Sequence, residues 1–119
     1  MNTHIAYDIG AKEVAIHLAR ILNCPLVMSD FSRLLIDPNR GVDDPTLVMK
    51  ISDDKIIDGN KNIYNFGESN ERNERIEDYY NIYHGKVSKL VNQKISNEQF
   101  PAIISIHSFT PFWKNTKRN

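Results

Sequence analysis

Residues 101–111, which read PAIISIHSFTP, decide the fold that we expect from this sequence. The stretch begins with a β-branched run, residues 102–106, that lacks a regular alternation of polar and apolar side chains. Such runs are typical of a strand that is buried on both faces of a parallel sheet. His107 follows directly, so the sequence predicts a histidine where a buried strand ends.

Two earlier segments show the spacing of amphipathic helices, residues 8–22 and residues 71–95. In both, apolar side chains recur three and four positions apart and form one stripe. Asp8 is a candidate N-cap, because its side-chain oxygen can accept hydrogen bonds from the first turn, and Asn23 is the expected end. The apolar stripes consist of Ala11, Val14, Ala15, Leu18 and Leu22 in the first helix and Ile76, Tyr80, Tyr83, Val87, Leu90 and Val91 in the second.

Two short apolar runs, residues 26–28 and 33–36, are each long enough for a buried strand. Residues 41–70 contain few apolar side chains, and a loop of that length is uncommon in a compact domain unless it is functional. The mixture of helices and strands predicts an α/β fold. Because only two or three strands are visible, we expect residues 1–119 to form a single partial domain that lacks flanks on both sides.

The composition excludes several classes of partner. Fifteen basic and fifteen acidic residues cancel, and nucleic-acid binders usually carry a basic surface. No apolar run approaches the roughly 18 residues that a membrane span needs. The N-terminus does not have the pattern of a secretory signal peptide, so a cytoplasmic location is expected. The single cysteine, Cys24, excludes an internal disulfide framework and a cysteine-rich zinc site.

His107 is the first candidate functional residue, because ligands of open α/β sheets bind beyond the carboxyl ends of the strands. A neutral imidazole there can bind a divalent metal while its second nitrogen is oriented by a carbonyl or carboxylate. The alternative is a histidine at a strand end whose hydrogen bonds are satisfied by the backbone. Composition alone favours this alternative, since a lone histidine is a weak metal signal.

Two arginines near the expected strand ends, Arg33 and Arg40, are candidate ligands for a carboxylate. Each guanidinium can bind a carboxylate with two parallel hydrogen bonds, and Asn39 could add an amide contact. The alternative is ion pairing with one of the aspartates at positions 37, 43 and 44. His84 lies beside the apolar stripe of the second helix, where a half-buried helix histidine is the simpler interpretation.

Taken in order, five segments resemble the N-formylglutamate amidohydrolase family. One such motif would be weak evidence, but five in register over nearly the whole chain are specific. The segments are residues 4–11 (HIAYDIGA), 31–34 (FSRL), 36–40 (IDPNR), 75–76 with 83–84 (RI and YH) and 106–111 (IHSFTP).

The resemblance implies a zinc carboxypeptidase-like fold, a three-layer α/β/α sandwich on a mostly parallel or mixed sheet, of which this chain would form a part. It makes His107 a zinc-ligand candidate and makes Asn39 and Arg40 candidates for binding a substrate carboxylate. Arg33 joins the substrate-binding candidates because it matches a family motif. The remaining candidates, for substrate contact or for support of the site, are His84, Asp8 and Ser108.

The reaction that the resemblance implies is hydrolysis of N-formyl-L-glutamate to formate and glutamate. Zinc would activate a water molecule, and a general base would move its proton to the leaving amine. The expected ligand is a small dicarboxylate or an N-acyl amino acid. No catalytic residue is assigned in this chain, since the general base is expected elsewhere in the family domain.

Family members extend beyond this chain on both sides, and most of their zinc ligands have no counterpart here. We therefore expect a truncated internal fragment that is inactive alone, and the remaining part of a split domain is a candidate partner. The main alternative is a non-catalytic remnant, or a carboxylate-binding module without metal. A structural or interaction protein with exposed sheet edges is a third hypothesis.

Overall fold

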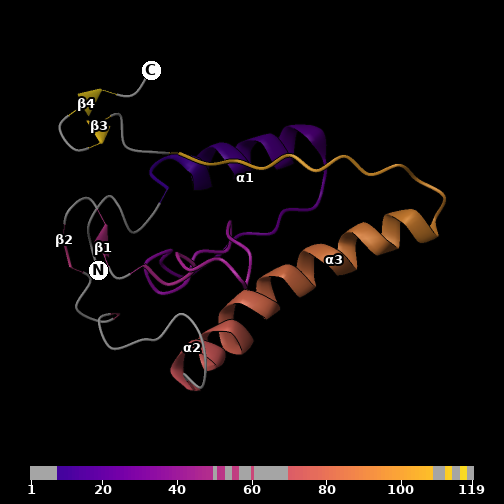
Figure 1. Ribbon diagram of the computed structural model, residues 1–119. Coiled ribbons are helices and arrows are strands. Elements are labelled where there is room, and N and C mark those ends of the chain that lie inside the picture. Colours follow the sequence, from indigo (N-terminus) through magenta and orange to yellow (C-terminus); the bar gives the residue numbers. More distant parts are fainter. Residues whose placement is uncertain are drawn as a thin grey trace.

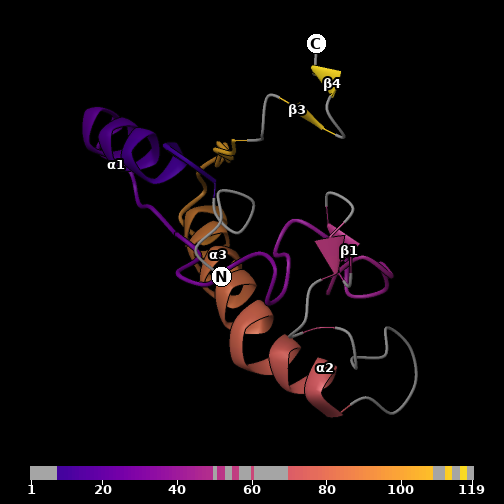
Figure 2. The same cartoon turned by 90° about the vertical axis from the view of Figure 1, so that its left-hand side faces the viewer.

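Two helical rods dominate the computed structural model, which describes residues 8–49, 51–52, 55–56, 60, 70–108, 112–113 and 116–117 (Figure 1). The first rod is α1, Ala11–Leu22. The second is one continuous helix made of α2, η2 and α3, and the two rods stand apart (Figure 2). The bounds of its parts are Asn70–Arg75 for α2, Ile76–Tyr80 for the π-helical segment η2 and Asn81–Ser96 for α3.

Helix α1 confirms the helix expected from the apolar stripe, but it begins later than expected. Gly10 occupies the N-cap position with φ 77°, a left-handed conformation that glycine adopts without steric cost. Asp8 therefore does not cap the helix, and the prediction that it does is wrong. The expected end at Asn23 is confirmed, since this residue is left-handed and its N–H donates to the carbonyl of Arg20. No residue of α1 is buried.

The second rod confirms the helix expected over residues 71–95, with one more residue at each end. Its apolar stripe packs against the turns formed by residues 31–48. Ile76 and Tyr80 contact the buried cluster of Ile36, Leu47 and Val48. This cluster, with the buried Leu34, is the hydrophobic core of the described residues.

The prediction of an α/β sandwich with a zinc carboxypeptidase-like sheet is wrong for this structure. The described residues contain only two isolated antiparallel pairs of two-residue strands, which are too short to form a layer. None of the three expected strands, residues 26–28, 33–36 and 102–106, is a strand. The observed pairs are β1 (Ile51–Ser52) with β2 (Lys55–Ile56) and β3 (Phe112–Trp113) with β4 (Thr116–Lys117).

The expected strands do not form, and the physical reason differs from one segment to the next. Residues 102–106 are extended, but Ile103 and Ile104 are 68% and 60% exposed, and no described backbone group pairs with this segment. Residues 33–36 instead curl into turns, because the N–H groups of Leu35 and Ile36 both donate to the carbonyl of Ser32. Apolar side chains in this segment are buried through the turn and not through a sheet.

Part of the expected long loop is a series of tight turns. The N–H of Asp44 donates to the carbonyl of Gly41, and the N–H of Leu47 donates to the carbonyl of Asp44. The series is closed by the N–H of Asp37, which donates to the carbonyl of Leu47 over 2.9 Å. Residues 32–47 therefore form one compact unit, against which the second rod packs.

Two buried polar side chains, Asn60 and Arg75, fasten this unit to the second rod. The amide nitrogen of Asn60 donates to the carbonyls of Leu34 and Met49, over 2.6 and 2.8 Å. The guanidinium of Arg75 donates to Asn60 Oδ1 and to the carbonyl of Leu35, over 2.6 and 2.8 Å. Buried polar groups are stable only when they are hydrogen-bonded, so the two side chains fix the path of the turns.

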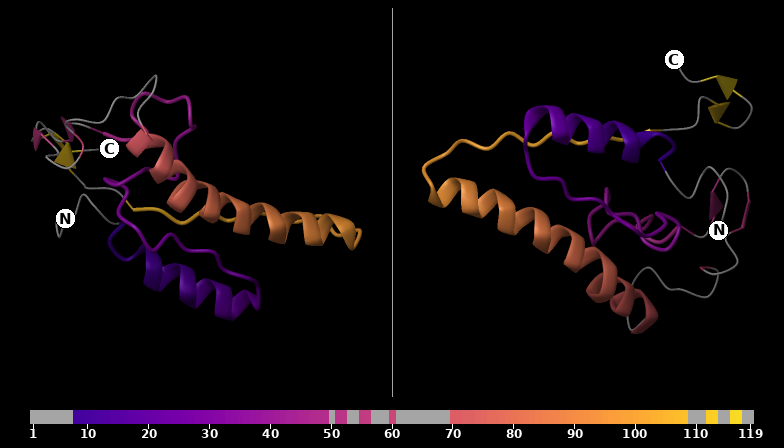
Figure 3. Two further views of the ribbon diagram at one scale, coloured as in Figure 1. Left: turned by 90° about the horizontal axis from the view of Figure 1, so that it is seen from below. Right: turned by 180° about the vertical axis from the view of Figure 1, so that it is seen from behind.

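The chain after α3 runs back as an extended segment toward the start of α1 (Figures 1 and 3). This return places His107 next to Asp8, although the two are distant in sequence. Among the described residues, no helix is sufficiently long and apolar to span a membrane.

Candidate functional site

Four of the residues predicted from the sequence meet in one group, Asp8, Arg33, Asn39 and His107, which we call the histidine cluster. The side-chain amide nitrogen Nδ2 of Asn39 lies 3.3 Å from Nδ1 of His107. Oδ2 of Asp8 lies 3.9 Å from the same ring nitrogen, and Oδ1 of Asp8 pairs with Arg33 over 3.3 Å. Three separate segments form the cluster: the residues before α1, the turns and the extended return.

Side chains contact both nitrogens of the His107 ring. The amide nitrogen of Asn39 can only donate, so Nδ1 of a neutral His107 is the acceptor. The proton is then on Nε2, which donates to Oγ of Ser105 over 2.9 Å. Within the described residues, the ring nitrogens of His107 contact side chains and not the backbone, and Nδ1 faces Asn39 and Asp8. The ring is 46% exposed, so a ligand can reach it.

Asp8 is oriented by the arginine beside it. Both side chains of the Asp8–Arg33 pair are about three-quarters buried, with exposed fractions of 24% and 28%. Because Arg33 binds one carboxylate oxygen, the other faces His107. Asp8 is a site candidate from the family resemblance as well as the expected helix cap, and the structure places it beside His107.

The histidine cluster contains two atoms of the kinds that bind zinc in proteins, His107 Nδ1 and Asp8 Oδ2. Two ligand atoms on a tetrahedral zinc lie roughly 3.3 Å apart when each bond is about 2.0–2.1 Å. His107 Nδ1 and Asp8 Oδ2, at 3.9 Å, are close to that separation. However, catalytic zinc uses three protein ligands, and the described part of the chain contains no group of three suited to a metal. His4 lies outside the described residues.

Arg40 lies next to the histidine cluster, in a turn organised by Asp37. The Asp37 carboxylate accepts from the N–H of Asn39 over 3.0 Å and from Nε of Arg40 over 3.3 Å. The terminal nitrogen Nη1 of Arg40 lies 3.7 Å from Oδ2 of Asp44. The ion pairing that we weighed as the alternative for Arg40 is therefore present. The Arg40 side chain is still 40% exposed, which leaves part of the guanidinium open to a ligand.

Asp44 is held in its charged form by its own turn. The hydroxyl and then the N–H of Thr46 donate to its carboxylate, and Arg40 adds a favourable charge. Together they lower the pKa of Asp44 below its ordinary value of 3.8. Asp44 is accordingly ionised at neutral pH and can compete with a bound carboxylate for Arg40.

Two side chains of the second rod hold the backbone around Asn39. The Tyr80 hydroxyl donates to the carbonyl of Arg40 over 2.7 Å, and Nε2 of His84 lies 2.9 Å from the carbonyl of Pro38. Burial, followed by the charges of nearby aspartates, raises the pKa of the Tyr80 hydroxyl above 10.0. The expectation of a half-buried helix histidine at position 84 is confirmed. Sequence reasoning missed the role of Tyr80, although positions four apart share one helical face.

Ser108, the last predicted site residue, is half-buried and makes no side-chain hydrogen bond within the described ranges. It follows His107, but the structure does not connect it to the cluster. Phe109, Thr110 and Pro111 of the same motif lie outside the described residues.

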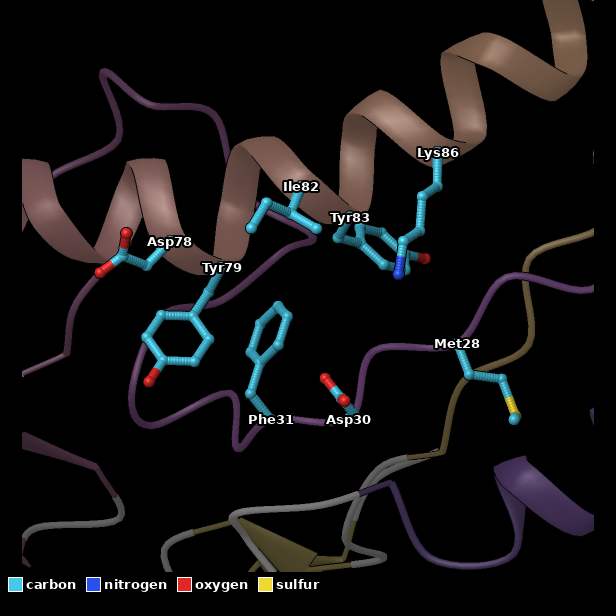
Figure 4. A pocket seen from close by; sticks show the side chains of 8 residues that line it. All are labelled: Met28, Asp30, Phe31, Asp78, Tyr79, Ile82, Tyr83 and Lys86. Atoms are coloured by element: carbon cyan, nitrogen blue, oxygen red, sulfur yellow. The ribbon is translucent and has the colours of Figure 1, made fainter.

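A shallow pocket between the turns and the second rod lies apart from these residues (Figure 4). Phe31 packs edge-on against Tyr79, with ring centres 5.4 Å apart, and faces Tyr83 at 6.5 Å. None of the residues predicted for the site lines this pocket. Its lining consists of Met28, Asp30, Phe31, Asp78, Tyr79, Ile82, Tyr83 and Lys86.

Comparison with known proteins gives a family and a related structure. A family model described as N-formylglutamate amidohydrolase matches residues 1–118. A crystal structure of a gene product from Agrobacterium tumefaciens is similar, with a TM-score of 0.88 and 32% sequence identity. The similarity covers 98% of this chain and 45% of that chain, so this chain spans less than half the length of its relative. No curated protein matches the sequence.

Proposed function

The chain belongs to the N-formylglutamate amidohydrolase family, and we propose that it contributes the carboxylate-binding part and one metal-binding histidine to hydrolysis of N-formyl-L-glutamate. The products would be formate and glutamate. The family supports an amidohydrolase reaction on a small-molecule amide. The observation that supports the assignment of residues is the approach of Asp8 and Asn39 to Nδ1 of His107.

Arg40 is the proposed anchor for a substrate carboxylate. Its Nε is held by Asp37 and one terminal nitrogen faces Asp44 at 3.7 Å. Exposed ion pairs of this kind contribute little to stability, so a substrate carboxylate can replace Asp44 without a large cost. Asn39, in the same turn, would add a neutral amide donor. Anchoring the glutamate part in this way orients the formyl amide relative to His107.

His107 is the proposed metal ligand, through Nδ1. This atom faces Asn39 and the carboxylate of Asp8, which is the second candidate metal ligand. Arg33 pairs with Oδ1 of Asp8 over 3.3 Å, and Oδ2 of the same carboxylate faces the ring. Bound zinc would supply an activated water and polarise the amide carbonyl. The described residues provide these two candidate ligands, one fewer than catalytic zinc requires.

A formate-release assay tests the whole proposal. The full chain is assayed alone and together with a polypeptide that carries the preceding part of a family domain, with and without zinc. We expect no turnover by the chain alone and zinc-dependent formate release in the mixture. His107→Ala and Arg40→Ala should abolish or strongly reduce that release, whereas His17→Ala, at an exposed position of α1, should not. A folded mixture without activity under all conditions would contradict the proposal.

A carboxylate-binding module without metal is the second candidate function. The incomplete set of metal ligands among the residues that the structure describes favours it. Calorimetric titration with N-formyl-L-glutamate distinguishes the two candidates. The module binds this ligand through Arg40 with the same affinity whether zinc is present or not, whereas the metal-dependent site binds it more tightly with zinc. Equal affinity in the parent and in Arg40→Ala would remove Arg40 from both schemes.

A further inference from the structure

The backbone on both sides of Asn39 is held by two side chains of the second rod. His84 contacts the carbonyl of Pro38, which precedes Asn39, over 2.9 Å. Tyr80 contacts the carbonyl of Arg40, which follows it, over 2.7 Å. The N–H of Asn39 itself donates to Asp37. The side chain of Asn39 points from this fixed backbone to His107.

The proton on the His84 ring can be assigned from its partner. A carbonyl oxygen only accepts hydrogen bonds, so Nε2 of His84 carries a proton and donates it to Pro38. The rings of Tyr80 and Tyr83 hold the imidazole in place, with centre distances of 4.4 and 5.1 Å. Tyr80 and His84 are four residues apart, so both donors project from one face of the rod.

We propose that His84 is a positioning residue, which acts through the carbonyl of Pro38 to direct the Asn39 amide toward His107 and to place Arg40. The inference rests on the proposed function of Asn39 and Arg40 as substrate-binding residues. His84 does not contact the substrate itself, because its Nε2 is occupied by Pro38 and its ring is packed against two tyrosines. Its contribution is the hydrogen-bond donor at this point of the turn.

The test compares substitutions that differ in one property, the ability to donate. In the full chain, His84→Gln keeps an N–H donor on a side chain of similar reach, while His84→Met has a similar size and no donor. If the Met variant does not fold, His84→Asn replaces it, because its amide is too short to reach the carbonyl. His17→Ala, on the exposed surface of α1, is the control.

Two readouts are measured for every variant. The first is the NMR signal of the Asn39 side-chain amide, assigned with Asn39→Asp, which needs no ligand. The second is the affinity for N-formyl-L-glutamate by calorimetry. We expect His84→Met to shift the Asn39 signal and to weaken binding about five- to tenfold, the loss typical of one hydrogen bond. His84→Gln should restore both properties to near the parent values.

The outcomes separate this inference from the proposed function. If the parent chain does not bind N-formyl-L-glutamate and the complemented mixture releases no formate, the proposed function fails, and the Asn39 signal alone decides the positioning role. An unchanged Asn39 signal in the variant without a donor overturns the inference. Equal effects of His84→Gln and His84→Met also overturn the inference, because they would show that His84 only fills space.

Discussion

Arg33 and Asp8 form an ion pair of 3.3 Å that joins the turns to the residues just before α1. The pair occupies one oxygen of the Asp8 carboxylate and leaves the other facing His107. The orientation of the histidine cluster depends on this connection.

Replacing Arg33 by Met should lower the free energy of unfolding by about 1 kcal/mol, the upper range for an ion pair that is partly exposed. Urea denaturation followed by circular dichroism measures the change. Arg20→Met, on the exposed side of α1, is the matched control and should change the free energy by less than about 0.5 kcal/mol. Equal effects of the two substitutions would show that the pair does not hold α1 in place.

Replacing Arg75 by Met should be much more destabilising, by about 3 kcal/mol, because buried partners lose a charged donor. The carbonyl of Leu35 and the amide oxygen of Asn60 would both be left unsatisfied. The same denaturation experiment applies, with Lys89→Met on the exposed face of α3 as control. A loss below about 1 kcal/mol would indicate that water replaces the guanidinium at little cost.

Replacing Thr46 by Val should change the way in which the free energy of unfolding depends on pH under acid conditions. The folded-state pKa of Asp44 is lowered below 3.8, chiefly by the Thr46 hydroxyl. A lowered folded pKa stabilises the fold above the unfolded value, and this stabilisation disappears as the pH falls through the folded pKa. In Thr46→Val the pKa of Asp44 should rise toward 3.8, as measured by NMR titration of the carboxyl carbon. An unchanged titration midpoint would exclude the hydroxyl as the cause.

At alkaline pH, the free energy of unfolding should depend on Tyr80, whose pKa is raised above 10.0 by burial. A raised folded pKa means that the stabilisation is complete below the unfolded value and is lost as the pH rises through the folded pKa. Absorbance at alkaline pH should therefore show a late phase of tyrosine ionisation, above pH 10.0. Tyr80→Phe should remove this late phase, whereas Tyr79→Phe, at a more exposed position, should keep it. A late phase that persists in Tyr80→Phe would assign it to another tyrosine.

Sequence periodicity predicted the helices well, because the 3.6-residue repeat is a local property. It failed for the strands. The run of residues 102–106 correctly indicated extended backbone, but a sheet also needs partner strands, and no described segment provides them. At residues 33–36 the apolar pattern correctly indicated burial. There the Ser32 hydroxyl accepts the N–H of Leu34 and favours a turn over a strand.

The resemblance identified Asn39 and His107 as site residues, and the structure places them in contact. Binding of zinc or substrate by these residues stays a prediction. Sequence reasoning did not predict the side chains that hold the turns by binding backbone carbonyls, which are Asn60, Arg75 and Tyr80. Each binds a carbonyl that lies 26 to 40 positions away in the sequence. Pairing of a side chain with a distant carbonyl leaves no local pattern in the sequence.

The fastening of the turns by Asn60 and Arg75 has a kinetic consequence. These hydrogen bonds close loops of 26 and 40 residues, whereas a helix propagates within about a microsecond from neighbouring residues alone. Long-range closure is the slower event during folding. A chain diluted from denaturant should recover its helical signal early and the proposed carboxylate binding late, so that ligand competence marks the final stage of refolding.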